Sequence, residues 1–204
     1  MIDVKELQLD LIEHGYPIGT ADGTAGRKTF AGLLAFIGKR KFDDMLDLGA
    51  ACANYLPRFG LMDTVPRLAN WLGQAAHESG SFRYLKEIWG PTDAQRRYEG
   101  RHDLGNTEPG DGKRFMGRGL FQVTGRNNYK EMAMRTGKPL LDQPELVEQP
   151  DAAVLTACIY WQSRGLSRLA DEGKEDDITR RINGGTTGII ERRVLVARAK
   201  SVLA

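Results

Sequence analysis

Apolar residues along the chain recur mainly at the three- and four-residue spacing of α-helices. Near the N-terminus, Leu7, Leu11 and Ile12 follow this spacing up to Gly15, and a glycine readily takes the left-handed conformation that ends a helix. A strand-like pattern is confined to residues 119–124. The patterns predict a mainly α protein, with helices at 4–14, 30–38, 45–56, 65–79, 125–137, 151–164, 176–182 and 190–203.

Polar and glycine-rich segments divide this helical pattern into two parts. Residues 15–26 are rich in turn formers, and two short helices with so long a connection bury too little surface to be stable alone. The basic run 39–41 follows these helices, so we place a domain boundary after residue 40. The sequence therefore predicts a small helical module at 1–40 and a larger domain at 41–204.

A long irregular segment interrupts the larger domain. Residues 90–118 contain six glycines, two prolines and few apolar residues. A loop of this length in a compact domain is more often functional than idle.

Composition and charge narrow the classes of function. Lys and Arg number 29 against 27 Asp and Glu among 204 residues, and the net charge of +2 gives no electrostatic reason to expect a nucleic-acid partner. No stretch approaches the roughly 20 apolar residues of a membrane span. The N-terminus also lacks an apolar run of signal-peptide length. We therefore expect a protein made in the cytoplasm without a signal peptide and not inserted in a membrane.

The cysteine and histidine pattern does not indicate a metal site. Cys52 and Cys158 lie in apolar helical surroundings, without a further cysteine or a histidine at metal-ligand spacing. Buried reduced thiols are expected rather than a disulfide framework. Residues 77–81 do not form the zinc-binding HExxH motif, because position 81 is Ser. The sequence therefore implies neither a metal nor another cofactor.

The segment AHESGSFRYLKE at 76–87 carries the densest signal for catalysis. Glu78 lies at the end of a predicted helix, with Trp71 and Ala75 on the same face. Such apolar neighbours would raise the pKa of its carboxyl and make a general acid available near neutral pH. Glu87 follows nine residues later and would face the opposite side if the helix continued.

A chain reversal after the first glutamate would change this geometry. The run Ser79-Gly80-Ser81 can end the helix and let Glu78 and Glu87 face one cleft. A separation of roughly 6.5–9.5 Å between the carboxyls would leave room for a water and give an inverting glycosidase. Two glutamates so close in sequence are nevertheless usually solvated, and a lone histidine such as His77 is usually structural. The residues alone leave both interpretations open.

Four motifs in order place the two acids in a wider context. AHESGSF at 76–82 is followed by Glu87, then by GRGLFQVTGRNNY at 117–129 and INGG at 182–185. Together they resemble the family 19 glycoside hydrolases, which are the chitinases and related phage endolysins of lysozyme-like fold. The resemblance covers most of residues 45–204 and implies a mainly α, lysozyme-like catalytic domain.

Carried onto this sequence, the resemblance implies catalytic roles for single residues. Glu78 corresponds to the general acid and Glu87 to the general base. Thr124 falls where the family has a hydroxyl that helps to hold the attacking water. Glu99, 21 residues after Glu78, is the alternative base, although it could instead shape the loop by pairing with neighbouring arginines.

The resemblance also implies a set of substrate-binding residues. Gln122 and Asn128 correspond to positions that line the sugar cleft, and the alternative is that they satisfy buried backbone. Asn183 corresponds to a substrate-contacting asparagine, and Arg193, less closely, to a supporting arginine. Amide side chains suit sugars because they donate and accept hydrogen bonds at once. Tyr129 fits the buried core as well as a sugar contact. The predicted set comprises His77, Gln122, Asn128, Tyr129, Asn183 and Arg193.

Residues 4–37 carry a second resemblance. The LQ near the start, the HGY, the DG-x-x-G turn and the Thr before the second helix are similar to the peptidoglycan-binding module of many wall hydrolases. The departure is Ile37-Gly38, where the module usually continues with Gln. The alternative is a small structural appendage that packs on the catalytic domain.

The two resemblances together imply an endolysin that hydrolyses β-1,4 glycosidic bonds of bacterial peptidoglycan by an inverting general acid/base mechanism. Its partner would be peptidoglycan glycan strands, bound by a monomer without a cofactor. It would reach the wall from the cytoplasm after a holin-dependent membrane lesion, although an exported toxin would look the same. The rival interpretations are a chitinase acting on N-acetylglucosamine polymers and a non-catalytic wall-binding or phage structural protein.

Overall fold

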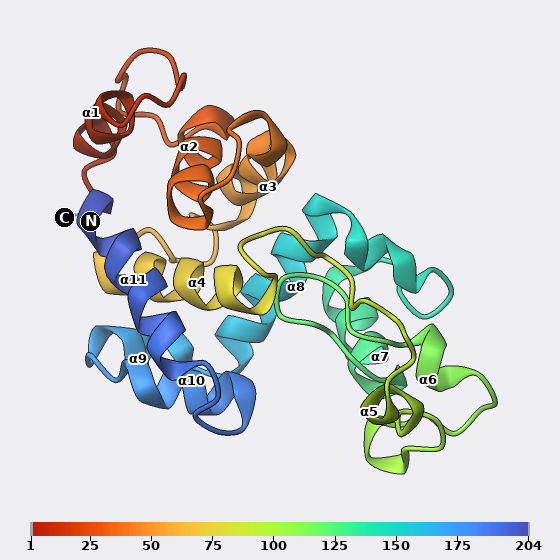
Figure 1. Cartoon of the computed structure of the whole chain (residues 1–204). Coiled ribbons are helices and arrows are strands. Elements are labelled where there is room, and N and C mark those ends of the chain that lie inside the picture. The colour runs from red at the N-terminus through yellow and green to blue at the C-terminus, as the bar shows by residue number, and fades with distance from the viewer. Residues whose placement is uncertain (1, 204) are drawn as a thin grey trace.

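The computed structural model describes residues 2–203, which form two helical lobes connected by α8 (Pro150–Ser163) (Figure 1). The larger lobe contains α1 (Val4–Glu13), α2 (Arg27–Gly38), α3 (Leu46–Tyr55), α4 (Val65–Glu78), α9 (Leu166–Asp171), α10 (Glu175–Asn183) and α11 (Ile189–Leu203). The smaller lobe contains α5 (Asp93–Arg96), α6 (Asp111–Arg114) and α7 (Arg126–Thr136). Short 3-10 helices lie at Asp43–Met45, His102–Leu104 and Pro144–Glu148. Residues 2–203 form no strand, so the prediction of a mainly α protein is confirmed.

The predicted helices match the observed ones apart from shifts at their ends and short helices that were missed. The pattern missed α9, because its six residues are too few to show a helical period. The strand-like segment 119–124 is mostly a turn, with one isolated β-bridge between Arg118 and Val123. Local pattern therefore located the long helices but not the short elements between them.

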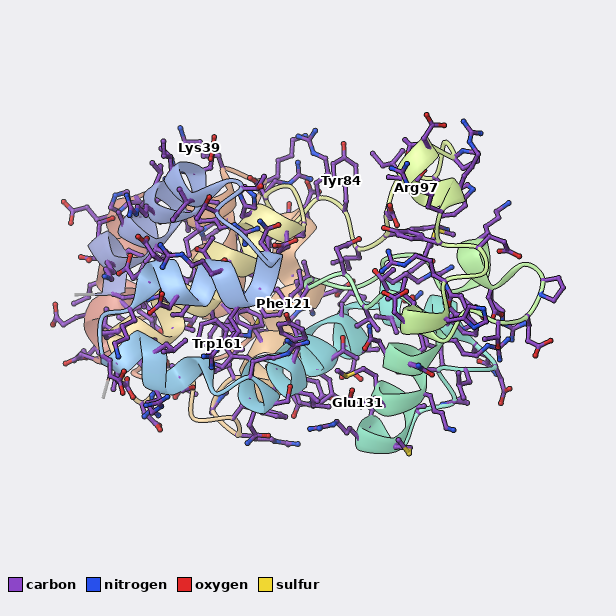
Figure 2. The ribbon with its side chains drawn as sticks, turned by 90° about the horizontal axis from the view of Figure 1, so that it is seen from below. Lys39, Tyr84, Arg97, Phe121, Glu131 and Trp161 are labelled. Atoms are coloured by element: carbon purple, nitrogen blue, oxygen red, sulfur yellow. The ribbon has the colours of Figure 1, made fainter. Side chains whose placement is uncertain are left out.

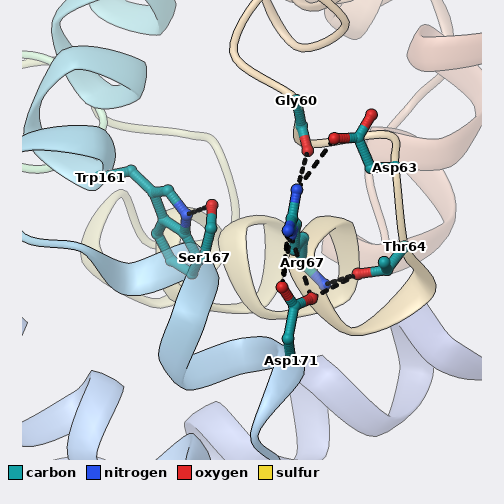
Figure 3. A network of polar contacts seen from close by, with 7 residues as sticks. All are labelled: Gly60, Asp63, Thr64, Arg67, Trp161, Ser167 and Asp171. Carbon is teal, nitrogen blue, oxygen red and sulfur yellow. Dashed lines mark hydrogen bonds and ion pairs between the residues drawn. The ribbon is translucent and has the colours of Figure 1, made fainter.

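A polar network fixes the beginning of α4 (Figure 3). The Thr64 hydroxyl accepts a hydrogen bond from the backbone N–H of Arg67 at 3.3 Å, as an N-cap residue does. The Arg67 guanidinium pairs with Asp171 at 2.6 Å and with Asp63 at 2.9 Å, and it donates to the carbonyl of Gly60 at 3.2 Å. The first turn of α4 is thereby attached to the preceding loop and to the end of α9.

Each lobe has its own hydrophobic core. The larger core joins buried residues of α1, α2, α3, α4, α8 and α11, among them the fully buried Trp71 and Leu11. The smaller core comprises Phe115, Val123, Tyr129, Met132, Leu140, Val147 and Ile159. Burying one large apolar side chain contributes roughly 1.5–3 kcal/mol, so each core holds its lobe together.

Two glycines allow helices of the larger lobe to approach closely. A Cβ added at Gly73 in α4 would lie 2.5 Å from Cγ2 and 2.9 Å from the backbone nitrogen of Val196 in α11. A Cβ added at Gly49 in α3 would lie 2.5 Å from the carbonyl oxygen of Arg27 in α2. The backbone of α4 is therefore held directly against α11, and this contact determines which side chains of α11 reach the end of α4.

The first two helices are packed into the larger lobe. Their buried residues belong to one core with those of α3, α4 and α11, and the Arg198 guanidinium of α11 donates to the carbonyl of Ile37 at 2.8 Å. The glycine-rich connection is held by Gln8, whose amide donates to Asp22 at 2.9 Å and accepts from the N–H of Gly23 at 2.8 Å. Packing thus continues across residue 40, and the domain boundary placed there stays a prediction.

The two cysteine side chains are free and buried, on α3 and α8 respectively. Burial raises the pKa of both the Cys52 and the Cys158 thiol well above its ordinary value. Such thiols are poor nucleophiles because the thiolate is the reactive form.

Candidate active site

Helix α4 ends at Glu78, and the chain reverses immediately afterwards. The Ser79 hydroxyl donates to the carbonyl of Ala75 at 2.6 Å and accepts from the N–H of Phe82 at 3.0 Å. Residues 80–82 all have positive φ, between 58° and 62°, and two of them are not glycine. Residues other than glycine are strained at positive φ. Such residues are kept in this conformation by the surrounding structure and are common at functional sites. The prediction that the helix ends here is confirmed.

A buried arginine holds the Glu78 carboxylate. Arg192 of α11 has a side chain only 2% exposed, and its Nη2 lies 2.5 Å from Glu78 Oε1. Its Nη1 donates to Gln74 Oε1 at 2.5 Å, and Gln74 Nε2 donates to Thr179 Oγ1 of α10 at 3.0 Å. The sequence placed only apolar neighbours around Glu78. The structure adds an opposite charge and a network that joins three helices.

His77 packs against the loop between α10 and α11. A Cβ added at Gly188 would lie 2.3 Å from the ring atom Cε1, so the ring and this loop are in direct contact. Burial, together with the positive charge of Arg192, lowers the pKa of His77 below its ordinary value. The imidazole is therefore neutral at pH 7, and its packing fits the structural role that a lone histidine usually has.

Glu87 lies on a short extended segment beside residues 117–119. Its backbone N–H donates to the carbonyl of Gly117 at 2.8 Å, and its Oε2 accepts from the Gly117 N–H at 3.1 Å. Its Oε1 accepts from Gln95 Nε2 at 2.9 Å and lies 3.5 Å from the Tyr98 hydroxyl. Burial and the neighbouring Glu87 charge raise the pKa of Tyr98, so that its hydroxyl stays protonated and can donate.

Three oxygens of predicted site residues surround one point beside Gly117. A Cβ added at Gly117 would lie 2.6 Å from Gln122 Oε1, 3.3 Å from Glu87 Oε2 and 3.3 Å from Thr124 Oγ1. Gln122 has a positive φ of 51°, a further strained residue at this place. The Thr124 hydroxyl donates to the carbonyl of Gln122 at 2.9 Å. The structure therefore brings the predicted base together with the Thr124 hydroxyl and with the amide of Gln122, which was predicted to line the sugar cleft.

A cavity of about 170 Å³ adjoins this point, and Gln122, Thr124 and Asn128 all line it. Figure 2 labels two further lining residues, Phe121 on the turn after residue 119 and Glu131 on α7. The amide of Asn128 donates to the carbonyl of Thr124 at 2.6 Å. The cavity thus combines apolar walls with amide and hydroxyl groups, a lining that suits a sugar.

Tyr160 forms part of the wall of this cavity. Its ring lines the cavity and lies 5.6 Å, centroid to centroid, from that of Phe121. Burial raises the pKa of Tyr160; the positive charge of Arg164 lowers it, and the negative charge of Glu78 raises it further. Glu87 adjoins the cavity through Gln122 and Thr124.

Glu99, the alternative base, holds a turn of the long loop. Its Oε1 accepts from the N–H of Gly110 at 2.6 Å and its Oε2 accepts from the N–H of Gly112 at 2.9 Å. Both carboxylate oxygens therefore bind backbone at the beginning of α6. The loop-shaping role fits this geometry, but the partners are backbone amides rather than arginines.

Sequence relatives place the chain in a family. None of the known protein-family profiles matches it. A glycosyl hydrolase family 19 domain-containing protein of Haemophilus influenzae is 33% identical over 152 residues, covering 61% of this chain and 74% of that protein. The chain belongs to glycoside hydrolase family 19. An endochitinase of Arabidopsis thaliana is 33% identical over 118 residues. The aligned part covers 58% of this chain and 39% of the longer plant protein.

Solved structures support the fold of this family 19 hydrolase. Chitinase C from Streptomyces griseus aligns with a TM-score of 0.68 over 91% of this chain and 79% of the chitinase, at 22% sequence identity. A bacterial family 19 chitinase aligns with a TM-score of 0.63 over 78% of this chain and 85% of the other, at 24% identity. The predicted lysozyme-like, mainly α fold of a glycoside hydrolase is confirmed.

Two residues predicted to bind substrate lie elsewhere in the hydrolase. Tyr129 is fully buried in the smaller core, and its hydroxyl donates to the carbonyl of Met116 at 2.8 Å, so its ring is a core side chain and not a sugar contact. Arg193 points outward and pairs with Asp176 at 2.6 Å. Its neighbour Arg192 is the arginine that binds Glu78, because successive residues of a helix point about 100° apart. Asn183 is exposed at the end of α10, before the loop that contacts His77.

The sequence offered signals for the supporting residues that it did not single out. Arg192 shares a helical face with Val196 and Ala199, both buried, so spacing alone marks it as the inward-facing arginine. Gln95 forms a capping box with Thr92 at the start of α5, and its side chain is thereby aimed at Glu87. Each of the two residues binds one of the predicted catalytic carboxylates, Arg192 that of Glu78 and Gln95 that of Glu87.

In residues 2–203, no helix is long and apolar enough to cross a membrane. The same residues contain no group of three or more His, Cys, Asp or Glu side chains placed to hold a metal ion.

Proposed function

We propose that this family 19 hydrolase cleaves β-1,4 glycosidic bonds of an N-acetylglucosamine-containing polymer by single displacement with inversion. Glu78 donates a proton to the glycosidic oxygen, and Glu87 accepts a proton from the water that attacks the anomeric carbon from the other side. Thr124 and Gln122 orient this water. The observation that carries the proposal is the convergence of the Glu87, Thr124 and Gln122 oxygens on one point beside the cavity; Glu78 is held separately, at the end of α4, by Arg192.

The two carboxylates have environments suited to different roles. Glu87 accepts hydrogen bonds at both oxygens, from the Gly117 N–H and the Gln95 amide, which hold its carboxyl group in one orientation beside Thr124. Glu78 is held at a single oxygen by Arg192, and no hydrogen bond to its Oε2 is found in residues 2–203. That oxygen is the one available to carry and deliver a proton.

We propose peptidoglycan as the polymer. The resemblance of residues 4–37 to a wall-binding module supports this choice. Because α1 and α2 share a core with α4 and α11, a glycan strand bound by this segment would be held at a fixed position relative to Glu78.

Chitin is the second candidate substrate. It is favoured by the names of the curated plant relatives, such as the endochitinase of Arabidopsis thaliana. The two polymers share the β-1,4 linkage and N-acetylglucosamine, so the proposed acid and base would act in the same way on either.

The test compares three glutamine variants on purified peptidoglycan and on N-acetylglucosamine hexamer. Glu78→Gln and Glu87→Gln should each lower kcat by about 10³-fold. Glu99→Gln is the matched control, and it should retain activity within about tenfold because Glu99 only holds a loop. NMR of the first product should show the inverted anomer. Full activity of Glu78→Gln or a retained anomeric configuration would contradict the mechanism. Cleavage of the hexamer but not of peptidoglycan would show that chitin is the substrate.

A further inference from the structure

Arg164 occupies a place in the cavity that the proposed reaction does not use. It follows the last residue of α8 and lines the cavity together with Gln122 and Thr124. Its guanidinium carbon lies 4.9 Å from the centroid of the Tyr160 ring, which places the cation over the aromatic face. Such stacking restricts a flexible side chain and leaves its N–H groups free to bind elsewhere.

The charges around Arg164 leave a positive excess at this side of the cavity. Arg181 of α10 donates to the backbone carbonyl of Arg164 at 2.9 Å, which brings a second arginine close. Within residues 2–203 neither guanidinium forms an ion pair, whereas the neighbouring Arg180 pairs with Asp177 at 2.7 Å. One acidic side chain also lines the cavity.

That acid is Glu131 of α7, labelled in Figure 2, and it already has a partner in an ion pair. Arg135, one turn further along the helix, binds it at 2.9 Å. Neither Arg164 nor Arg181 therefore has an acidic side chain within ion-pair distance in residues 2–203. An exposed guanidinium that lines a cavity and has no ion-pair partner can bind an anion.

We propose that Arg164, assisted by Arg181, binds a carboxylate carried by the glycan and makes the enzyme prefer an acidic glycan to a neutral one. This inference rests on the proposed function and specifies its substrate class. Polymers of N-acetylglucosamine carry no carboxylate. Peptidoglycan carries one on the lactyl group of each muramic acid when the peptide is absent, and others on the peptide stems when they are present. A planar guanidinium can bind such a group through two parallel hydrogen bonds.

A purely structural role for Arg164 predicts a different result. A cation at the C-terminal end of a helix also interacts favourably with the helix dipole. In that case its loss would affect stability, or activity on every substrate alike. Selectivity between charged and neutral glycans separates the two roles.

The experiment measures kcat/KM of the full chain on three substrates: peptidoglycan with its stems, peptide-free glycan strands with bare lactyl carboxylates, and N-acetylglucosamine hexamer. Arg164→Gln should lower kcat/KM by about tenfold on carboxylate-bearing strands and by less than about twofold on the hexamer. Arg181→Gln should cause a smaller loss of the same selectivity. Arg168→Gln is the matched control, since its side chain is 72% exposed, pairs with Glu172 and does not line the cavity.

The two carboxylate sources give different outcomes, both of which support the proposal. A loss on peptide-free strands identifies the lactyl group, and a loss only on strands with stems identifies the peptide. An equal loss on all three substrates, no loss on any, or cleavage of the hexamer alone by the unaltered enzyme would overturn it. Failure of the proposed function itself is distinguishable, because then the unaltered enzyme cleaves none of the three or Glu78→Gln stays active.

Discussion

The Arg192 guanidinium lies against the Glu78 carboxylate with 2.5 Å between Nη2 and Oε1, although the two residues are 114 positions apart in sequence. The arginine is almost completely buried, while the glutamate is partly open to solvent. A buried cation needs such a partner, because an uncompensated charge in the interior costs several kcal/mol. The pair therefore fixes the orientation of the glutamate at the point where α4 ends.

Loss of this arginine should damage turnover more than binding. We expect Arg192→Gln to lower kcat by about 10²-fold with a smaller change in KM, because Glu78 loses its orienting charge. Arg192→Lys should retain part of the activity, since lysine keeps the positive charge but lacks the planar guanidinium that binds Gln74 and Glu78 together. Arg193→Gln, the matched control on the surface, should stay within about twofold. Steady-state kinetics with a pH profile and a melting curve check this, and equal losses at the two arginines would contradict it.

A methyl group at Gly117 should block the site without unfolding the protein. The added carbon would meet Gln122 Oε1 at 2.6 Å and lie 3.3 Å from both Glu87 and Thr124 oxygens. We expect Gly117→Ala to lower kcat/KM by about tenfold or more, because the water-binding point is filled. Gly26→Ala, whose Cβ would meet nothing closer than 3.9 Å, is the control. Unchanged activity in a folded Gly117→Ala protein would exclude this point from the reaction.

A methyl group at Gly73 should destabilise the larger lobe. Its Cβ would lie 2.5 Å from Val196 Cγ2 and 2.9 Å from the Val196 backbone nitrogen, so α11 must move. Overpacking of this kind costs about 1–3 kcal/mol, which lowers Tm by several degrees in a chain of this size. Because α11 carries Arg192, activity below Tm should fall as well. Calorimetry and kinetics of Gly73→Ala measure both effects. A Tm equal to that of the unaltered protein would show that α4 and α11 can move apart to admit the methyl group without loss of stability.

The ion pair at the start of α4 should make stability depend on pH in the acid range (Figure 3). Hydrogen bonds from Arg67, and secondarily from Thr64, lower the pKa of Asp171 below its ordinary value. The native state therefore binds fewer protons there than the unfolded state, so this stabilisation is complete above the ordinary Asp pKa of about 3.9 and disappears as the pH falls through the lower native value.

Replacing this aspartate gives the measurement. Asp171→Asn should lower Tm by about 2–4 °C at pH 7, and the difference from the unaltered protein should shrink below about pH 4. Thermal unfolding followed by circular dichroism at a series of pH values tests it. A difference in Tm that stays constant down to pH 2 would show that charge pairing does not stabilise the start of α4.

Local physics in the sequence was enough to determine the long helices and the place where α4 ends. Apolar spacing predicted α4 and α11, and Ser79-Gly80-Ser81 predicted the reversal, because these properties depend on residues within one or two turns. Local spacing left the role of Glu78 and Glu87 open, and the resemblance to family 19 hydrolases named them as acid and base. Neither predicted which side chains surround the two carboxyl groups.

The tertiary structure decided the partners of those carboxylates. Spacing marks Arg192 as the inward-facing arginine of α11, but that its partner is Glu78 follows from the close packing of α11 on α4 at Gly73. Glu99 is drawn into a turn by backbone N–H groups 11 and 13 residues away, and Arg164 is placed in the cavity by the course of α8. A periodic pattern shows which face of a helix is buried, but the residue that meets it depends on long-range packing that only the folded chain fixes.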